Sequence, residues 1–94
     1  MILIINTSGA GLEFVLGDRY AHVDAEKQSV ALPVAAEQFM TACGAGWRDL
    51  TAIGVVVGPG SFTGIRLGIA YAKGLSMELG IPIVPIKAII RKCL

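Results

Sequence analysis

The stretch VVVGPGSFTGIRLGIAYAKGL, residues 55–75, combines the end of a strand, a glycine turn and the start of a helix. Three β-branched residues run into the Gly-Pro-Gly of residues 58–60, and a pattern with helical spacing and many small residues follows directly. The first N–H groups of such a helix and its positive dipole end can bind an anion. The glycines can instead serve only to shape the turn, with Ser61 or Thr63 capping the helix. Both interpretations are open on this motif alone.

The glycines of this loop miss the two common phosphate-binding motifs. A dinucleotide fingerprint needs its third glycine at position 63, where this chain has Thr63. A Walker loop needs Lys and then Ser or Thr after its last glycine, whereas Ile65 and Arg66 follow Gly64. The remaining functional interpretation is the general capacity of a helix N-terminus to bind an anion.

Apolar runs and helical spacing on either side of this stretch predict an alternating order of strands and helices. The predicted elements are a strand at 1–6, a hairpin at 11–24 that turns at 16–19, a helix at 29–43, a strand at 51–58, a helix at 63–79 and a strand at 81–86. Glycines at 44 and 80 are expected to end the helices, and Pro33 is expected in the first turn, where its missing N–H is tolerated. The order βββαβαβ predicts an α/β domain with a mixed sheet.

Small residues on the second helix are expected to let the sheet or another helix approach closely. These residues are Gly64, Gly68, Ala72 and Gly74. The helix also carries two stripes, one of Leu67, Tyr71, Leu75 and Glu78 and one of Ile65, Ile69, Ala72 and Ser76. One stripe is expected to pack on the sheet and the other to meet a partner, and the pattern does not assign them.

The composition favours a small domain with an interaction surface. The chain has 94 residues, of which 54% are apolar and 16% charged, and its mean hydropathy is +0.70. A chain of this length buries only about 60% of the surface that its unfolded form exposes. Part of the apolar surface is therefore expected to face a partner. The net charge of +1 includes no basic run, which argues against direct nucleic-acid binding.

The sequence favours a cytoplasmic protein with no membrane span. The apolar start MILII is short and lacks a positively charged beginning, so no signal peptide is expected. The apolar helical segment 62–79 carries Arg66, Lys73 and Glu78, which a membrane span would not tolerate.

The turn after the first strand is a second place where a phosphate could bind. Thr7 and Ser8 could contact phosphate oxygens, whereas an uncharged Asn6 is a poor magnesium ligand and fits an Asx turn better. Together with the glycine loop, the candidate phosphate contacts are Thr7, Ser8, Gly58, Gly60 and Ser61.

Other polar residues form no pattern that indicates catalysis or metal binding. His22 stands alone on its predicted strand and is expected to be a surface or hydrogen-bonded histidine. Cys43 and Cys93 are far apart, fit no metal spacing and are expected to be a core thiol and a tail thiol. The serines lack a histidine partner. No catalytic residue, metal or cofactor is predicted.

Several segments together resemble the N-terminal lobe of the TsaB (YeaZ) family. They are MILIINTS at 1–8, Leu-Pro at 32–33, GPGSFTGIRLGIAYAKGL at 58–75 and GIPIVPI at 80–86. The resemblance covers nearly the whole chain, and residues 58–68 are specific to that family. It implies an α/β fold of the actin-like ATPase (RNase H-like) kind, with a single domain over 1–94 and the second lobe of the family absent.

The resemblance also implies a function in tRNA modification. TsaB proteins are non-catalytic partners that scaffold and activate the TsaD transferase, which works with the TsaE ATPase. Together they transfer a threonylcarbamoyl group from its adenylate to N6 of adenosine 37 in tRNAs that read codons beginning with A. A TsaD-like and a TsaE-like partner are therefore expected, with tRNA reached only through the complex and a homodimer formed in isolation.

The pairing of family members through the two helices of this lobe implies a set of interface candidates. These are Leu32, Ala36, Phe39, Leu67, Tyr71 and Leu75.

Two departures from the family pattern weaken nucleotide and metal binding. The first strand usually ends in Asp-Thr-Ser, and this chain has Asn6 in place of the Asp. Many members have His-Ser or His-Thr where this chain has Lys27 and Gln28. A nucleotide-binding ATPase or kinase-like domain is the alternative function, and it would need an acidic residue at position 6. A glycoprotease would need a metal or nucleophile cluster that the sequence does not contain.

Overall fold

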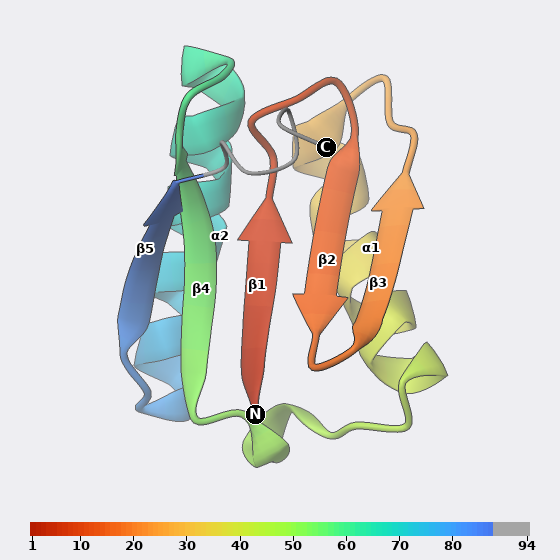
Figure 1. The fold of residues 1–94 in the computed structure, drawn as a ribbon, viewed down its shortest axis with the longest axis vertical. Coiled ribbons are helices and arrows are strands. Elements are labelled where there is room, and N and C mark those ends of the chain that lie inside the picture. Colours follow the sequence, from red (N-terminus) through yellow and green to blue (C-terminus); the bar gives the residue numbers. More distant parts are fainter. Residues whose placement is uncertain (88–94) are drawn as a thin grey trace.

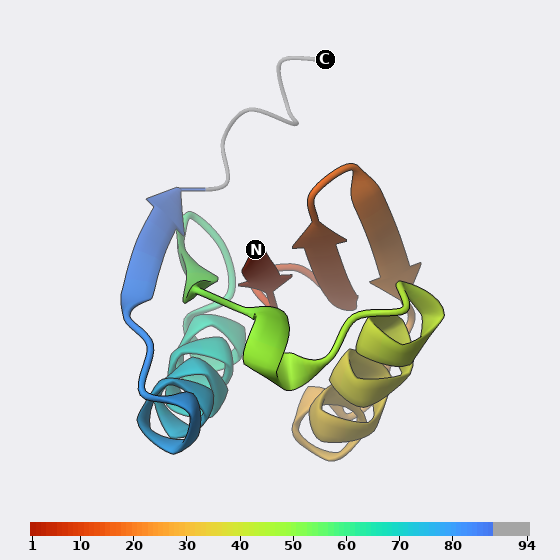
Figure 2. The same cartoon turned by 90° about the horizontal axis from the view of Figure 1, so that it is seen from below.

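The computed structural model describes residues 1–87, which form a five-stranded mixed sheet with two α-helices on one face (Figures 1 and 2). The elements are β1 (Ile2–Asn6), β2 (Leu12–Leu16), β3 (Arg19–Val23), α1 (Gln28–Ala42), the 3-10 helix η1 (Trp47–Asp49), β4 (Ala52–Gly58), α2 (Phe62–Leu79) and β5 (Ile83–Lys87). The predicted order βββαβαβ is confirmed, with η1 as an addition before β4. The predicted tail thiol, Cys93, lies outside the described residues.

The sheet has the strand order β3-β2-β1-β4-β5. The hairpin strands β2 and β3 pair antiparallel, and so do β1 and β2, whereas β4 runs parallel to both β1 and β5. Gly17 has a φ of 62° in the two-residue hairpin turn, where a left-handed residue matches the twist of the strands. Since β1 and β4 are parallel neighbours, their carboxyl ends lie at the same edge of the sheet, and the loops that follow them meet there.

The hydrophobic core lies between the sheet and the two helices. The β1 residues Leu3 and Ile5 are fully buried, and the ring of Phe14 on β2 stacks on that of Phe39 on α1 with the centroids 5.5 Å apart. Burying such a side chain stabilises the fold by about 1.5–3 kcal/mol. In α1 the buried side chains are Leu32, Ala35, Ala36, Phe39 and Met40. The apolar stripe of α1 is therefore used by the core of this lobe.

The helix ends agree with the signals in the sequence, but the position of one proline in α1 differs from the prediction. Gly44 and Gly80 take φ angles of 69° and 67° just after α1 and α2, as expected of glycines that end helices. Pro33 was expected in the first turn of α1 but lies inside the helix, beyond the turn that begins at Gln28. Its side chain is exposed, so the ring is accommodated on the outer face of the helix.

Candidate functional site

The loops that follow β1 and β4 meet at one edge of the sheet and bond directly to each other (Figure 1). The main-chain N–H of Ser61 donates to the carbonyl oxygen of Ser8 at 2.8 Å. Thr7 is fully buried, and Ser8 is 9% exposed. The structure thus brings together the two segments predicted to bind phosphate, and the two segments pack directly against each other.

The glycines of the second loop permit this close contact. Gly58 and Gly60 have φ angles of 147° and 150°, which side-chain-bearing residues rarely adopt. A Cβ atom at Gly60 would lie 2.5 Å from the carbonyl oxygen of Ser8. A Cβ atom at Gly64, in the first turn of α2, would collide with the carbonyl oxygen of Thr7. Gly58 therefore has a conformational role, Gly64 a packing role and Gly60 both.

The polar groups of this corner bond within the chain. The hydroxyl of Thr7 donates to the carbonyl oxygen of Gly64. The hydroxyl and main-chain N–H of Ser8 donate to Oδ1 of Asn6 at 2.6 and 2.9 Å, which confirms the predicted Asx turn. The side chain of Ser61 caps α2 by accepting from the N–H of Gly64 at 3.2 Å, whereas Thr63 makes no cap. Of these bonds, the one from Thr7 to Gly64 connects the end of β1 to the first turn of α2.

Gln28 also reaches this corner, from the first turn of α1. Its amide nitrogen lies within hydrogen-bonding distance of the carbonyl oxygens of Thr7, Gly9 and Gly11. The sequence marked Gln28 only as a departure from the family pattern. No local signal could have found this contact, because the three acceptors lie far from Gln28 along the chain and reach it only through the fold.

A second polar cluster joins β1, β2 and β3. Glu13 accepts from the amide of Asn6 at 2.7 Å and from the hydroxyl of Tyr20 at 2.6 Å. His22 lies 3.7 Å from Glu13 and 3.1 Å from Asp24, so this histidine is hydrogen-bonded, as the sequence predicted. Within residues 1–87, no group of three or more His, Cys, Asp or Glu side chains is arranged to hold a metal ion.

The predicted partner residues of α1 are in the core. Leu32, Ala36 and Phe39 are all buried against the sheet, so the expectation that they meet a partner is corrected. The physical reason is that an apolar stripe on a helix packs against the nearest apolar surface, which here is the sheet of the same lobe.

The predicted partner residues of α2 lie beside the core rather than in it. Leu67, Tyr71 and Leu75 are half-buried and pack against the core cluster. Burial and, to a smaller extent, the carboxylate of Glu37 raise the pKa of Tyr71 above its ordinary value. The stripe closest to the sheet consists of Gly64, Gly68 and Ala72, which are all buried.

The outer faces of both helices expose apolar side chains. Val30 and Val34 on α1 are 70% and 58% exposed, and Phe62 and Met77 on α2 are 73% and 84% exposed. The guanidinium of Arg66 lies 5.4 Å from the ring centre of Phe62. Large exposed side chains of this kind on neighbouring helices favour an interaction surface.

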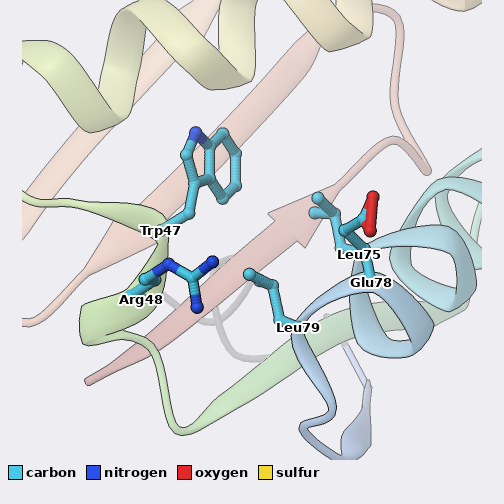
Figure 3. Close-up of a pocket in the computed structure, with 5 residues that line it drawn as sticks. All are labelled: Trp47, Arg48, Leu75, Glu78 and Leu79. Atoms are coloured by element: carbon cyan, nitrogen blue, oxygen red, sulfur yellow. The ribbon is translucent and has the colours of Figure 1, made fainter.

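A pocket of about 360 Å³ lies between η1 and α2 (Figure 3). Trp47 and Arg48 of η1 line it on one side, and Leu75, Glu78 and Leu79 of α2 line it on the other. Its walls are mainly apolar, with one positive and one negative side chain. Of these residues, the sequence singled out only Leu75 as a partner residue; the one tryptophan of the chain was the signal that could have pointed to Trp47.

The sheet order and the two helices on one face define an actin-like, RNase H-like α/β lobe. YeaZ from Pseudomonas aeruginosa has the same fold, with a TM-score of 0.80 and 22% identity over 92% of this chain and 44% of that chain. The family described as TsaD, tRNA N6-adenosine threonylcarbamoyltransferase, matches residues 22–91. The chain belongs to this family and is a TsaB/YeaZ-like member of it.

Some curated relatives are named TsaB, and others are named tRNA N6-adenosine threonylcarbamoyltransferase. The tRNA threonylcarbamoyladenosine biosynthesis protein TsaB of Bacillus subtilis is 32% identical, a match that covers 94% of this chain and 41% of the relative. TsaB of Escherichia coli is 34% identical over 56% of this chain and 23% of the relative. The tRNA N6-adenosine threonylcarbamoyltransferase of Pyrobaculum aerophilum is 34% identical over 66% of this chain and 18% of the relative. The chain therefore spans less than half the length of these relatives.

Neither α1 nor α2, nor any other helix among residues 1–87, is both long and apolar enough to span a membrane.

Proposed function

We propose that this chain is a non-catalytic scaffold and activating partner of a TsaD-like transferase in the threonylcarbamoylation of tRNA adenosine 37. One observation carries the proposal: the corner formed by the loops after β1 and β4 is filled by the chain's own main-chain and hydroxyl groups. The Bacillus subtilis relative, named a tRNA threonylcarbamoyladenosine biosynthesis protein, supports the pathway.

Several of the groups that could bind a phosphate already bond within the chain, which supports the non-catalytic role. The hydroxyls of Thr7 and Ser8 donate within the chain, and Asn6 offers an amide where a carboxylate would bind magnesium. At the start of α2, the N–H groups of Ser61, Gly64 and Ile65 donate to oxygens of Ser8 and Ser61. A nucleotide-binding ATPase or kinase-like function is therefore the less favoured alternative.

Partner binding is proposed for the outer faces of α1 and α2 and for the pocket between η1 and α2. Val34 and Met77 would be covered there, and the pocket beside Trp47 would take an apolar side chain of the partner. The proposed partners are a TsaD-like transferase and a TsaE-like ATPase, with tRNA reached through the complex in the cytoplasm. In isolation the same helices would form a homodimer.

The test is reconstitution of the modification. A TsaD transferase and a TsaE ATPase are supplied with tRNA and threonylcarbamoyl-adenylate, with and without this chain, and modified adenosine is measured. We expect the parent chain to raise the rate, and Val34→Asp and Met77→Asp to reduce the effect. Val84→Asp, on the exposed side of β5, is the matched control and should retain it. A rate that the parent chain leaves unchanged would refute the activating role.

Calorimetry tests the alternative function. We expect no saturable signal at micromolar concentrations of ATP with Mg²⁺, because the hydroxyls of Thr7 and Ser8 already bond within the chain and Asn6 carries no charge to bind Mg²⁺. A saturable signal that Ser8→Ala removes would favour a nucleotide-binding domain instead.

A further inference from the structure

The amide nitrogen of Gln28 connects the first turn of α1 to the whole loop between β1 and β2. Nε2 lies 3.1 Å from the carbonyl oxygen of Thr7, 3.0 Å from that of Gly9 and 2.8 Å from that of Gly11. A primary amide has two N–H bonds, so three acceptors compete for two hydrogens. The loop carbonyls thus converge on a single donor atom.

The other end of the same amide faces α2. A Cβ atom added at Gly64 would lie 3.2 Å from Oε1 of Gln28 and would collide with the carbonyl oxygen of Thr7. The missing side chain of Gly64 therefore leaves the room in which Gln28 and the Thr7 carbonyl lie against α2. Gln28 contacts the loop through its nitrogen and approaches α2 through its oxygen.

Thr7 completes the connection between the two helices. Its carbonyl oxygen accepts from Gln28 of α1, and its hydroxyl donates to the carbonyl oxygen of Gly64 of α2. Thr7 is fully buried, so water cannot readily replace either bond. At their C-terminal ends α1 and α2 lie on either side of η1, as Figure 2 shows. The first turns of both helices are therefore held through one buried residue.

We propose that Gln28 is a positioning residue that sets the placement of α1 relative to α2 and, through it, the shape of the surface that meets the partner. The first part stands on the geometry alone. The second part rests on the proposed function, since it assumes that the outer faces of the two helices bind a TsaD-like transferase.

Three substitutions separate the possible roles of the side chain. Gln28→Ala removes the donor, and Gln28→Glu replaces it with a carboxylate that has no hydrogen to donate when ionised. Gln28→Lys restores a donor with three N–H bonds, enough for the three carbonyls, on a chain one bond longer. Gln38→Ala is the matched control for hydrogen exchange, because it makes the same change at an exposed position of the same helix. It is not a control for affinity, because Gln38 lies beside Val34 on the outer face of α1 that is proposed to bind the partner.

Two measurements are made on each variant: amide hydrogen exchange of residues 7–11 and 61–66, and affinity for a TsaD transferase. We expect Gln28→Ala and Gln28→Glu to speed exchange in both segments by about tenfold, the change that ~1.4 kcal/mol produces. Affinity should weaken by a similar factor. Gln28→Lys should restore the exchange rates and the affinity to within about threefold of the parent values. This residual change is smaller than the tenfold effect expected of the other two variants, which corresponds to ~1.4 kcal/mol.

The possible failures are distinguishable. Exchange in Gln28→Ala equal to that in Gln38→Ala, or faster in 7–11 alone, would overturn the connection to α2. A Gln28→Lys variant that behaves like Gln28→Ala would overturn the role of the donor. Faster exchange in both segments with unchanged affinity would overturn the effect on the partner surface. A parent chain that does not bind the transferase would overturn the proposed function, while hydrogen exchange would still decide the positioning role.

Discussion

The hydroxyl of Thr7, just after β1, donates a hydrogen bond to the main-chain carbonyl of Gly64 in α2, and Gly64 has no space for a side chain on that side. The bond joins residues 57 positions apart in the sequence. Together with the bond from Ser61 to Ser8, it gives the glycine loop a structural purpose: it lets the first turn of α2 lie against the backbone at the end of β1.

Gly64→Ala should therefore destabilise the protein by about 1–3 kcal/mol, because the new methyl group collides with the carbonyl oxygen of Thr7. Gly74→Ala is the control on the same helix, since a Cβ atom there has nothing within 4 Å. It should stabilise by up to ~1 kcal/mol through the higher helix propensity of alanine. Urea unfolding midpoints compare the two, and equal midpoints would contradict the close approach at Gly64.

Gly60→Val should lower stability by about 1–3 kcal/mol through backbone strain. The φ of 150° disfavours a side chain, and the Cβ atom would also meet the carbonyl oxygen of Ser8. Gly9→Val, in the adjacent loop, has open space around its Cβ position and should change the melting temperature much less. Should Gly60→Val melt with the parent, the structural role of the loop would be lost and anion binding would need to be reconsidered.

Phe39→Asp should unfold the lobe, because Phe39 is buried and stacks on Phe14. Met77→Asp should leave the melting temperature nearly unchanged, since Met77 is 84% exposed. If α2 is part of a symmetric dimer, that charge is introduced twice in the interface, and Met77→Asp should be monomeric by light scattering. A parent chain that is itself a monodisperse monomer at tens of micromolar would rule out the homodimer, whatever Met77→Asp does.

Tyr71 should make stability depend on pH in the alkaline range. Burial, with Glu37 as the smaller cause, raises the pKa of Tyr71 above 10.0, so the folded state favours the neutral phenol. This contribution is fully present below the unfolded pKa of 10.0 and is lost as the pH rises through the folded pKa. Tyr71→Phe should therefore lose less stability than the parent in that range, as measured by urea unfolding. Equal losses in the two proteins would contradict the assignment.

Local rules determined the elements of this protein from the sequence. The apolar runs, the glycines after each helix and the Asx turn at Asn6 were predictable, because each involves residues only a few positions apart. For the cap of α2 the same local rules left two candidates, Ser61 and Thr63, of which Ser61 is the cap. Pro33 was misplaced because the predicted start at residue 29 already put the proline beyond the first turn of about 3.6 residues, and the observed start at Gln28 places it one residue further in.

The tertiary structure decided what each surface contacts. A helical stripe such as Leu32, Ala36 and Phe39 is equally suited to a sheet or to a partner, and only the position of the sheet shows that the core takes it. The three carbonyls around Gln28 converge because β1, β2 and the first turns of both helices meet at one corner. Such contacts between distant segments follow from the path of the chain in space, which the periodicity of a sequence does not contain.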